Sequence, residues 1–167
     1  IFDSDGNVID LRRLPRLASH RLVEQCMVLA NEVVASKLFR QKVPSIYRIH
    51  EPPGQDKLHR LVPVLANFGV ALPPKRAITP RILQEALRRI ERLGEAGGIL
   101  RRVILRAMMR AEYAPENKGH YGLGSSCYTH FTSPIRRYPD LIVHRMLKSV
   151  IAGEHKDEQF RKFWKER

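Results

Sequence analysis

The sequence predicts an α+β fold that is mostly helical, and two observations lead to this prediction. Apolar residues recur every three or four positions along several long stretches, which is the period of an amphipathic helix. Alternation with a period of two is confined to short runs, of which residues 45–50 are the clearest. The chain has 167 residues, about the length of one domain, so we expect these elements to pack together.

A long helix is predicted from Ser19 to about Gln41, after a hairpin over residues 1–13. An Asp-Gly turn dipeptide at residues 5–6 indicates the hairpin, and Ser19 is a suitable N-cap for the helix. The apolar face of this helix is predicted to consist of two adjacent rows, Leu22, Cys26, Leu29 and Val33 in one and Val23, Met27, Ala30 and Val34 in the other. Glu24 lies at the edge of that face, where a partly buried carboxylate needs a partner or a ligand.

A strand and two further helices are predicted next. The strand covers residues 45–50, and a helix over residues 55–68 ends at Gly69. Thr79 and Pro80 are an N-cap and a first helical residue, so another helix begins there. Its core face is predicted to consist of Ile82, Leu83, Ala86, Leu87 and Ile90.

A helix over residues 99–111 follows a glycine-rich break at residues 94–98. Its apolar side is predicted to consist of Ile99, Val103, Ala107 and Met108. Arg102, Arg106 and Arg110 are spaced four residues apart, which predicts a basic stripe. This stripe either follows a phosphate backbone or is a solvated face, and we favour the solvated face.

The last helix is predicted from Pro139 to about Ala152, after a loop over residues 113–133. Pro139 cannot continue a preceding helix, because its ring clashes with the turn before it, so residues 134–138 predict a separate turn. A polar tail with Phe160, Phe163 and Trp164 is predicted to continue as helix.

The chain is strongly basic, with 30 Lys and Arg against 17 Asp and Glu and a formal net charge of +13. This excess indicates a polyanionic partner, with nucleic acid the first candidate and an anionic membrane surface the second. No run of 18 apolar residues occurs, so the sequence predicts no membrane-spanning helix. Cys26 and Cys127 belong to no CxxC pair, so we expect no zinc site and two reduced thiols in a cytoplasmic protein.

Residues 119–141 combine arginines, aromatic residues and helix-start signals. Arg136 and Arg137 lie between two helix starts, where backbone N–H groups attract anions, and a guanidinium group binds phosphate through two N–H groups. The aromatic residues nearby, which can stack on bases, are Tyr128, Phe131 and Tyr138. The pattern is typical of single-stranded nucleic-acid binding. In the other interpretation, the arginines pair with Asp140 or Glu112 and the aromatic residues fill a core.

This stretch resembles the signature of the ribonuclease II/ribonuclease R family, also called the RNB family. The resemblance lies in Gly-His-Tyr-Gly-Leu-Gly at residues 119–124 and in Tyr-Thr-His-Phe-Thr-Ser-Pro-Ile-Arg-Arg-Tyr-Pro-Asp-Leu at residues 128–141, and it is closer to ribonuclease R. Three other stretches are similar to the same family, at residues 19–32, 47–51 and 109–113. The resemblance implies that residues 1–153 are the C-terminal part of the RNB catalytic domain, with short strands and a helix-lined RNA channel. Residues 154–167 would be a polar helical tail of that domain.

The resemblance implies a processive 3′-to-5′ exoribonuclease that releases 5′-nucleoside monophosphates from single-stranded RNA. It also implies Mg²⁺ held by a cluster of aspartates. No Asp-x-Asp-Asp grouping occurs in this sequence, so we expect the metal ligands upstream, no metal site here, and no hydrolysis by this chain in isolation. Because the sequence begins with Ile-Phe-Asp rather than Met, we expect it to be part of a longer polypeptide. The resemblance implies that the rest of that polypeptide contains an upstream catalytic half and flanking small β-barrel domains. An RNA-binding relative that has lost catalysis is the alternative.

Two residues match functional positions of the family. Arg136 matches the arginine that contacts phosphate near the scissile bond, with a structural ion pair as the alternative. Glu24 matches the glutamate that contacts the 3′-terminal nucleotide, with a buried salt bridge to an arginine as the alternative. We expect Arg136 and Glu24 to line the same cavity.

Further RNA-binding candidates are Arg137, Tyr121, His120 and Tyr128. For Arg137 we favour an ion pair with Asp140, and for Tyr121 a place in the core. For His120 a structural hydrogen bond is the more common role of a loop histidine.

Overall fold

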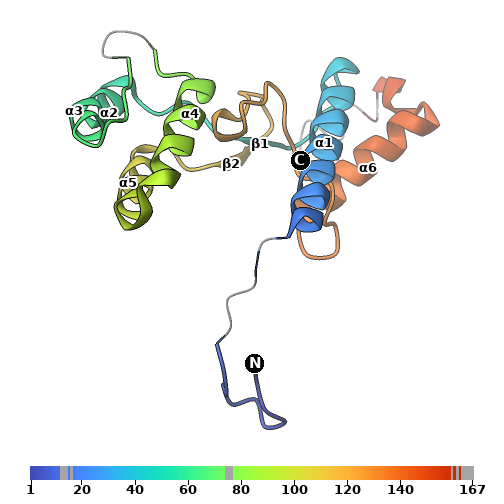
Figure 1. Cartoon of the computed structure of the whole chain (residues 1–167). Helices are drawn as coiled ribbons and strands as arrows, with labels where there is room; N and C mark the ends of the chain where they lie inside the picture. The colour runs from blue at the N-terminus through green and yellow to red at the C-terminus, as the bar shows by residue number, and fades with distance from the viewer. Residues whose placement is uncertain (12–14, 16, 74–76, 159, 161, 163–167) are drawn as a thin grey trace.

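The computed structural model describes residues 1–11, 15, 17–73, 77–158, 160 and 162. Its helices over these residues are α1 (Ala18–Arg40), α2 (Gln55–His59), α3 (Leu61–Ala66), α4 (Pro80–Ile90), α5 (Gly94–Ala107) and α6 (Tyr138–Ala152). The described strands are β1 (Tyr47–Ile49) and β2 (Glu112–Ala114), and single 3₁₀ turns are η1 (Glu91–Leu93), η2 (Tyr121–Leu123) and η3 (Glu154–Lys156). This confirms the mostly helical α+β class. Figure 1 shows α2 to α5 on one side, α1 and α6 on the other, and the strands between them.

The short sheet joins the two sides. β1 and β2 pair antiparallel, with Tyr47 opposite Ala114 and Ile49 opposite Glu112. The other edge of β1 is hydrogen-bonded to the segment around Tyr128: the Arg48 backbone N–H donates to the Tyr128 carbonyl at 2.9 Å. The strand is shorter than the predicted residues 45–50, yet it fixes the segment around Tyr128 beside the sheet.

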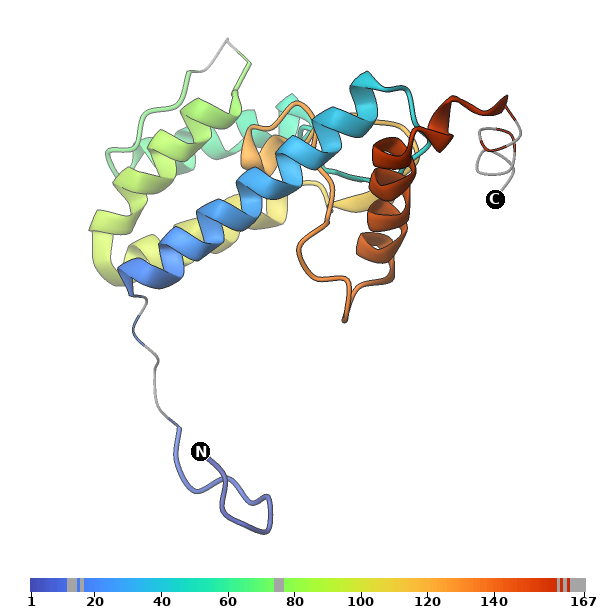
Figure 2. The ribbon, with the colours of Figure 1, turned by 90° about the vertical axis from the view of Figure 1, so that its right-hand side faces the viewer.

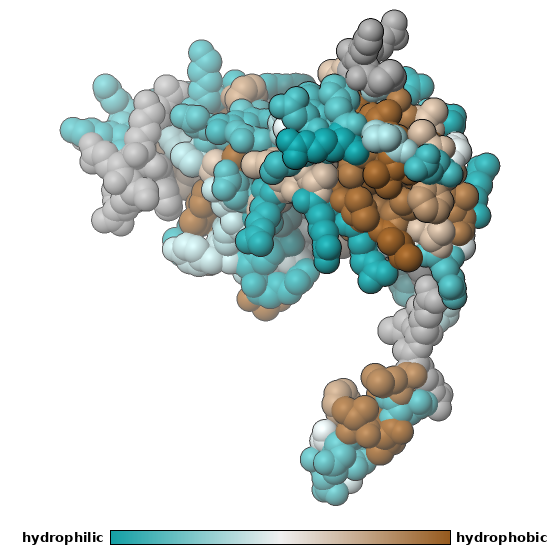
Figure 3. All heavy atoms as spheres, turned by 90° about the vertical axis from the view of Figure 1, so that its left-hand side faces the viewer, coloured by the Kyte–Doolittle hydropathy of each residue, from teal (hydrophilic) through white to brown (hydrophobic). Residues whose placement is uncertain are grey.

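The first hydrophobic core lies among α2 to α5. It consists of Leu58, Leu65, Val70, Leu72, Ile78, Leu83, Ala86, Ile90, Leu100 and Ile104. The Thr79 hydroxyl accepts from the Ile82 backbone N–H at 3.4 Å, which confirms the predicted N-cap of α4. The helix predicted over residues 55–68 is broken at Arg60, because Pro63 has no N–H for the carbonyl four residues earlier. Figure 3 views the molecule from this side and shows apolar residues gathered on one part of a largely hydrophilic face.

Helix α5 corrects the prediction for residues 99–111. It begins at Gly94, ends at Ala107, and buries Gly97, Leu100 and Ile104. Ile99, which was predicted to face the core, is 57% exposed. The reason is a close approach at Gly97, where a Cβ atom would lie 2.2 Å from the Ile90 carbonyl oxygen. Arg110 lies beyond the helix, so the predicted three-arginine stripe is not continuous.

The second core lies between α1 and α6 and consists of Val34, Leu38, Val43, Val143 and Met146. Helix α1 has Leu17 rather than Ser19 as its N-cap, and its predicted first apolar row is wrong, whereas Val34 of the second row is buried as predicted. Leu22, Leu29 and Val33 are 66%, 60% and 58% exposed. The buried residues of α1 are Asn31, Val34, Ala35 and Leu38. The residues of α1 that are buried are therefore those on the face that α6 covers, and the polar residue Asn31 is one of them. Figure 2 shows α1 along the side that faces the viewer, with the segment leading to α6 beside it.

Near both ends of the chain, the described residues have the structure that the sequence predicts. Phe2 and Val8 form an antiparallel bridge, and Gly6 has φ +85° in the turn between them, which confirms a hairpin. Helix α6 starts at Tyr138 with a proline in its first turn, as predicted, and Gly153 ends it with φ +80°. In the tail, Phe160 packs against the second core. Phe163 and Trp164 lie outside the described residues, so the helical tail stays a prediction. Among the helices that are described, none has both the length and the apolar character needed to cross a bilayer.

Candidate nucleic-acid interface

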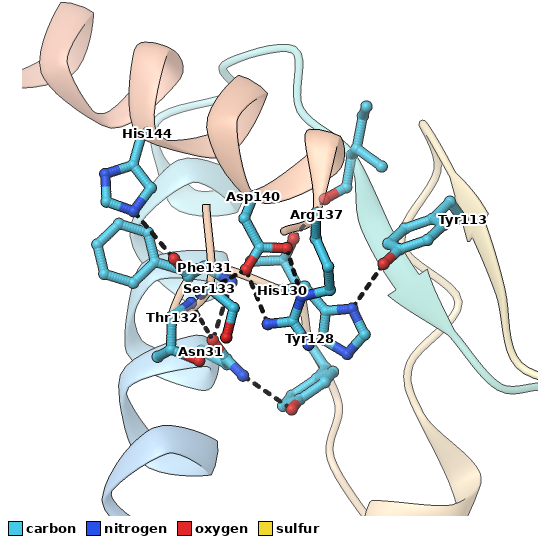
Figure 4. Close-up of polar contacts among 12 residues, drawn as sticks. Asn31, Tyr113, Tyr128, His130, Phe131, Thr132, Ser133, Arg137, Asp140 and His144 are labelled. Atoms are coloured by element: carbon cyan, nitrogen blue, oxygen red, sulfur yellow. Dashed lines mark hydrogen bonds and ion pairs between the residues drawn. The ribbon is translucent and has the colours of Figure 1, made fainter. Parts of the chain in front are cut away.

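The residues with the strongest functional pattern lie on one loop, residues 128–137, which we call the arginine loop. It begins beside β1, where the Thr129 hydroxyl donates to the Ile46 carbonyl at 2.5 Å. It then passes between α1 and α6 (Figure 4) and ends at Arg137, the N-cap of α6. Three sequence candidates, Tyr128, Arg136 and Arg137, therefore come from one short segment.

Arg137 is held in a forked ion pair with Asp140. Its Nε donates to Oδ1 at 2.9 Å and its Nη2 to Oδ2 at 2.8 Å. The Asp140 carboxylate is fully buried and also accepts from the Ser133 backbone N–H at 2.8 Å. The buried charge is thus matched by a cation and by a backbone donor, as a buried carboxylate requires. This geometry is the ion pair that the sequence favoured for Arg137.

Arg136 has a different environment, although it is the next residue. It lies in a turn in which its backbone N–H donates to the Ser133 carbonyl at 3.3 Å, and the residue is exposed. Its side chain forms no ion pair with any residue that the structure describes. The guanidinium group of Arg136 is consequently available to an anion from outside the chain.

A hollow of about 430 Å³ lies against the N-terminal half of α1. It is lined by residues of α1 between Ser19 and Asn31 and by Tyr128, Thr132 and Arg137. The hollow brings Glu24, Arg137 and Tyr128 together. Arg136 does not line it, so the expectation that Arg136 and Glu24 share one cavity is not met, and Arg137 occupies that place. Glu24 is exposed rather than partly buried, because the apolar side of this half of α1 is uncovered.

Tyr121 and His120 lie elsewhere, around a separate hollow of about 540 Å³ that also includes His50. The Tyr121 hydroxyl donates to the Ile78 carbonyl at 2.5 Å and the ring packs on the first core, as the core alternative predicted. His120 Nδ1 accepts from the Leu123 backbone N–H at 3.2 Å, which is a structural hydrogen bond. These two candidates are not brought to the hollow that contains Glu24.

His50 is held in place by two hydrogen bonds of its ring. Its Nδ1 accepts from the Gly122 backbone N–H at 3.0 Å, so its Nε2 carries the proton and donates to the Met109 carbonyl at 2.9 Å. The neighbouring His120 ring packs edge-on at 5.1 Å between centroids. Burial, followed by the nearby His50, lowers the pKa of His120 to about 4.

A second histidine of low pKa lies on the arginine loop itself. His130 Nδ1 and the Tyr113 hydroxyl share a hydrogen bond of 2.7 Å, and the His130 ring packs edge-on against Tyr128 at 5.8 Å. Burial, followed by the charge of Arg137, lowers the pKa of His130 to about 4. Both histidines are therefore neutral at physiological pH.

Asn31 is a buried polar residue that the sequence candidates did not include. It is 3% exposed and hydrogen-bonds to Tyr128 and to two backbone N–H groups of the arginine loop. A signal for it was present, since Asn31 lies in one row with Glu24 at the edge of an apolar face. A polar residue in such a row has a partner, but the sequence does not say which one.

The described residues contain no group of three or more His, Cys, Asp or Glu side chains placed to hold a metal ion. We therefore derive no chemical step from a metal in the described part of the chain.

Comparison with known proteins supports the resemblance seen in the sequence. The family model described as RNB domain matches residues 1–153. The chain is 41% identical over 157 residues to ribonuclease R of Aquifex aeolicus (strain VF5), covering 94% of this chain and 22% of that protein. It is 39% identical over 154 residues to ribonuclease R of Escherichia coli (strain K12), covering 92% and 19%. The chain thus spans about a fifth of the length of these curated relatives.

Solved structures show the same similarity. A ribonuclease R from Mycoplasma genitalium in complex with ribose-methylated single-stranded RNA aligns with a TM-score of 0.86 at 28% identity, over 99% of this chain and 26% of that one. Yeast Ssd1, described as a pseudonuclease, aligns with a TM-score of 0.70 at 28% identity, over 83% and 18%. From its sequence match over residues 1–153, which the matching fold supports, we conclude that this chain belongs to the RNB domain family.

Proposed function

We propose that the intact protein is a processive 3′-to-5′ exoribonuclease that hydrolyses single-stranded RNA to 5′-nucleoside monophosphates. In this proposal the present chain supplies RNA and phosphate contacts. The observation that carries it is the contrast between adjacent arginines: Asp140 neutralises Arg137, whereas Arg136 is exposed without an ion pair in the described residues. An unneutralised guanidinium beside a fixed one is suited to bind a phosphate that arrives from outside.

Arg136 is the proposed phosphate contact near the scissile bond. Its planar group can hold two phosphate oxygens and offset the charge that develops during attack. The Ser133–Asp140 hydrogen bond and the Arg137–Asp140 pair fix the backbone on both sides of it, so the group approaches the phosphate from a rigid base. Preorganised charge of this kind stabilises a transition state without rearrangement.

Glu24 and Tyr128 are the proposed contacts for the terminal nucleotide. Both line the hollow along α1, where the carboxylate can accept from ribose hydroxyls and the aromatic ring can pack against a base. His120, Tyr121 and Arg137 contribute to the proposal as supports of the loops, because each is engaged in a contact within the protein.

The proposed enzyme uses Mg²⁺ bound by aspartates that precede this chain, together with an upstream catalytic half and flanking small β-barrel domains. On this view, the isolated chain does not hydrolyse RNA. The length of the relatives supports this, since the chain covers 22% of one and 19% of another. A cytoplasmic location is part of the proposal, and free thiols at Cys26 and Cys127 are in keeping with it.

The test is Arg136→Lys in the intact protein, with turnover measured on a 5′-labelled single-stranded RNA. Lysine keeps the charge but cannot supply a two-pronged phosphate contact, so turnover should fall at least about tenfold. Arg102→Lys is the matched control, because Arg102 is exposed on α5, away from the arginine loop, and should leave turnover unchanged. Equal turnover in wild type and Arg136→Lys would contradict the role of Arg136.

The second candidate function is that of an RNA-binding protein without catalysis. The similarity to yeast Ssd1, which is described as a pseudonuclease, supports this candidate. The upstream sequence separates the two. An intact cluster of aspartates there, with release of nucleoside monophosphates from labelled RNA, supports the enzyme. Substituted aspartates with retained RNA binding support the binder.

A further inference from the structure

We propose that Asn31 is a positioning residue that fixes the arginine loop to helix α1, and so sets where Tyr128 and Arg136 lie relative to Glu24. This inference rests on the proposed function. It concerns the protein contacts that hold the site in place.

The carboxamide of Asn31 bonds to the loop in both directions. Its Oδ1 accepts from the backbone N–H groups of Phe131 and Thr132, at 2.9 and 3.3 Å. Its Nδ2 donates to the Tyr128 hydroxyl at 2.9 Å. Figure 4 shows this group between α1 and the loop. A carboxamide combines an acceptor with donors in one plane, which these partners require.

Helix geometry couples this contact to Glu24. Asn31 follows Glu24 by seven residues, which is close to two turns, so both side chains lie on one face about 10 Å apart along the axis. Both also line the same hollow. A loop that is bonded to Asn31 is therefore placed relative to Glu24 by a single rigid helix.

The other half of the loop is fixed from α6. Asp140 accepts from Ser133 and Arg137, while His144 Nε2 donates to the Phe131 carbonyl at 2.9 Å and its ring stacks on Phe131 at 4.1 Å. Since α1 and α6 pack through the second core, the loop is held between two elements that are themselves fixed. Arg136 lies in the part held by α6, and Asn31 is the side chain that ties this assembly to the face of α1 that carries Glu24.

The contacts predict how a change at Asn31 acts. Its removal would leave Tyr128, Arg136 and Glu24 in the chain but alter their relative positions. A displacement of about 1 Å in a reacting site lowers the rate by up to about a hundredfold. The removal of Asn31 should therefore lower kcat more than it raises KM. A residue that serves folding only would reduce activity in proportion to the unfolded fraction.

The experiment compares three variants of the intact protein on a 5′-labelled single-stranded RNA, with kcat, KM and the unfolding temperature measured for each. In Asn31→Leu, leucine has a shape similar to asparagine but makes no hydrogen bonds. At temperatures below the unfolding temperature, kcat of this variant should be lower than that of wild type by at least about tenfold. Asn31→Asp keeps the acceptor for Phe131 and Thr132, and the Tyr128 hydroxyl can donate to it, so kcat should recover to within about threefold of wild type. Tyr128→Phe removes one hydrogen bond, and kcat should fall about threefold.

Leu100→Ala is the control for lost stability, because Leu100 lies in the core of α2 to α5, away from the loop. Wild-type kcat in folded Asn31→Leu, or a loss no larger than that of the control, overturns the positioning role while leaving the exonuclease proposal intact. If Asn31→Leu does not fold, the other two variants decide. The positioning role is overturned if Tyr128→Phe keeps the wild-type kcat and Asn31→Asp has a kcat below about a tenth of wild type. An intact wild-type protein that releases no nucleotides with Mg²⁺ overturns both proposals.

Discussion

The region of α2 to α5 and the region around α1, α6 and the arginine loop bury different kinds of side chain. Between residues 55 and 107, every buried residue in the described part is apolar or glycine. The other region also buries polar residues, namely Asn31, Ser45, His50, Thr129, Asp140, Ser149 and His155. Most of these side chains form hydrogen bonds to a loop or to a strand edge rather than to a residue of their own helix. The first region is held together by packing, whereas the second uses buried hydrogen bonds to specify one loop conformation.

This difference supports the site that we propose. Buried polar groups contribute little net stability when satisfied and cost much when they lose a partner. In this region, Asn31 and Asp140 bond to the arginine loop and so fix its position between α1 and α6. The helices α2 to α5 have no such feature in their described residues, so we expect their substitutions to change stability without changing chemistry.

The largest effect is expected for Leu100→Ala in the first region. Leu100 is 3% exposed, and removal of a buried leucine side chain leaves a cavity, so the free energy of unfolding should fall by about 3 kcal/mol. Urea unfolding followed by circular dichroism measures this change. Turnover per folded molecule should match wild type, and a large loss of kcat in the folded variant would break the distinction between the two regions.

The sequence predicted this first region well and the second only in part. Helix α4 was predicted with its cap and its buried residues, because Thr79-Pro80 and the apolar period are local signals. The core-facing side of α5 was predicted only in part. Ala107 and Met108 pack against the core as predicted, whereas the burial of Gly97 depends on its close approach to Ile90, a contact between two elements. For α1, the apolar pattern indicated Leu22 and Leu29, whereas the packing of α6 and the loop selected the face of Asn31.

The candidate site follows the same rule. The Arg137–Asp140 pair was foreseen because its members are three residues apart. The bonds of Asn31 reach about a hundred residues along the chain, to Phe131, and no local pattern encodes such a partner. Arg136 and Glu24 were expected in one cavity on resemblance, but the orientation of adjacent side chains placed Arg137 there instead.

A smaller effect is expected from pH, and it should come from the second region. The pKa values of His120 and His130 are lowered to about 4 in the folded protein from an ordinary 6.5. The unfolded chain therefore binds more protons between these values, so their contribution is present above pH 6.5 and is lost as pH falls to about 4. Both rings are only half-buried, and solvent screening reduces the combined loss to about 1 kcal/mol.

Urea midpoints measured between pH 7.5 and 4.5 test this expectation. His130→Gln should flatten the profile, because glutamine does not titrate. His20→Gln, at an exposed position of α1, should leave the profile unchanged. A wild-type profile that is flat from pH 7 to 4.5 would show that the aromatic contacts of His130 do not depend on its neutral form.

The smallest effect within this chain is expected for Leu29→Lys, on the uncovered apolar face of α1. Leu29 is 60% exposed, and leucine and lysine have similar helix propensities, so the free energy of unfolding should change by less than about 0.5 kcal/mol. In the longer protein that we propose, this face packs against the upstream half, and the same change would place an ammonium group in an apolar contact at a cost of about 2 kcal/mol or more. Thermal unfolding of both proteins, with Gln25→Lys on the polar side of α1 as the control, measures the difference. Equal small shifts in the two proteins would mean that the apolar face stays in solvent, and that the uncovered half of α1 belongs to the RNA path rather than to the interior.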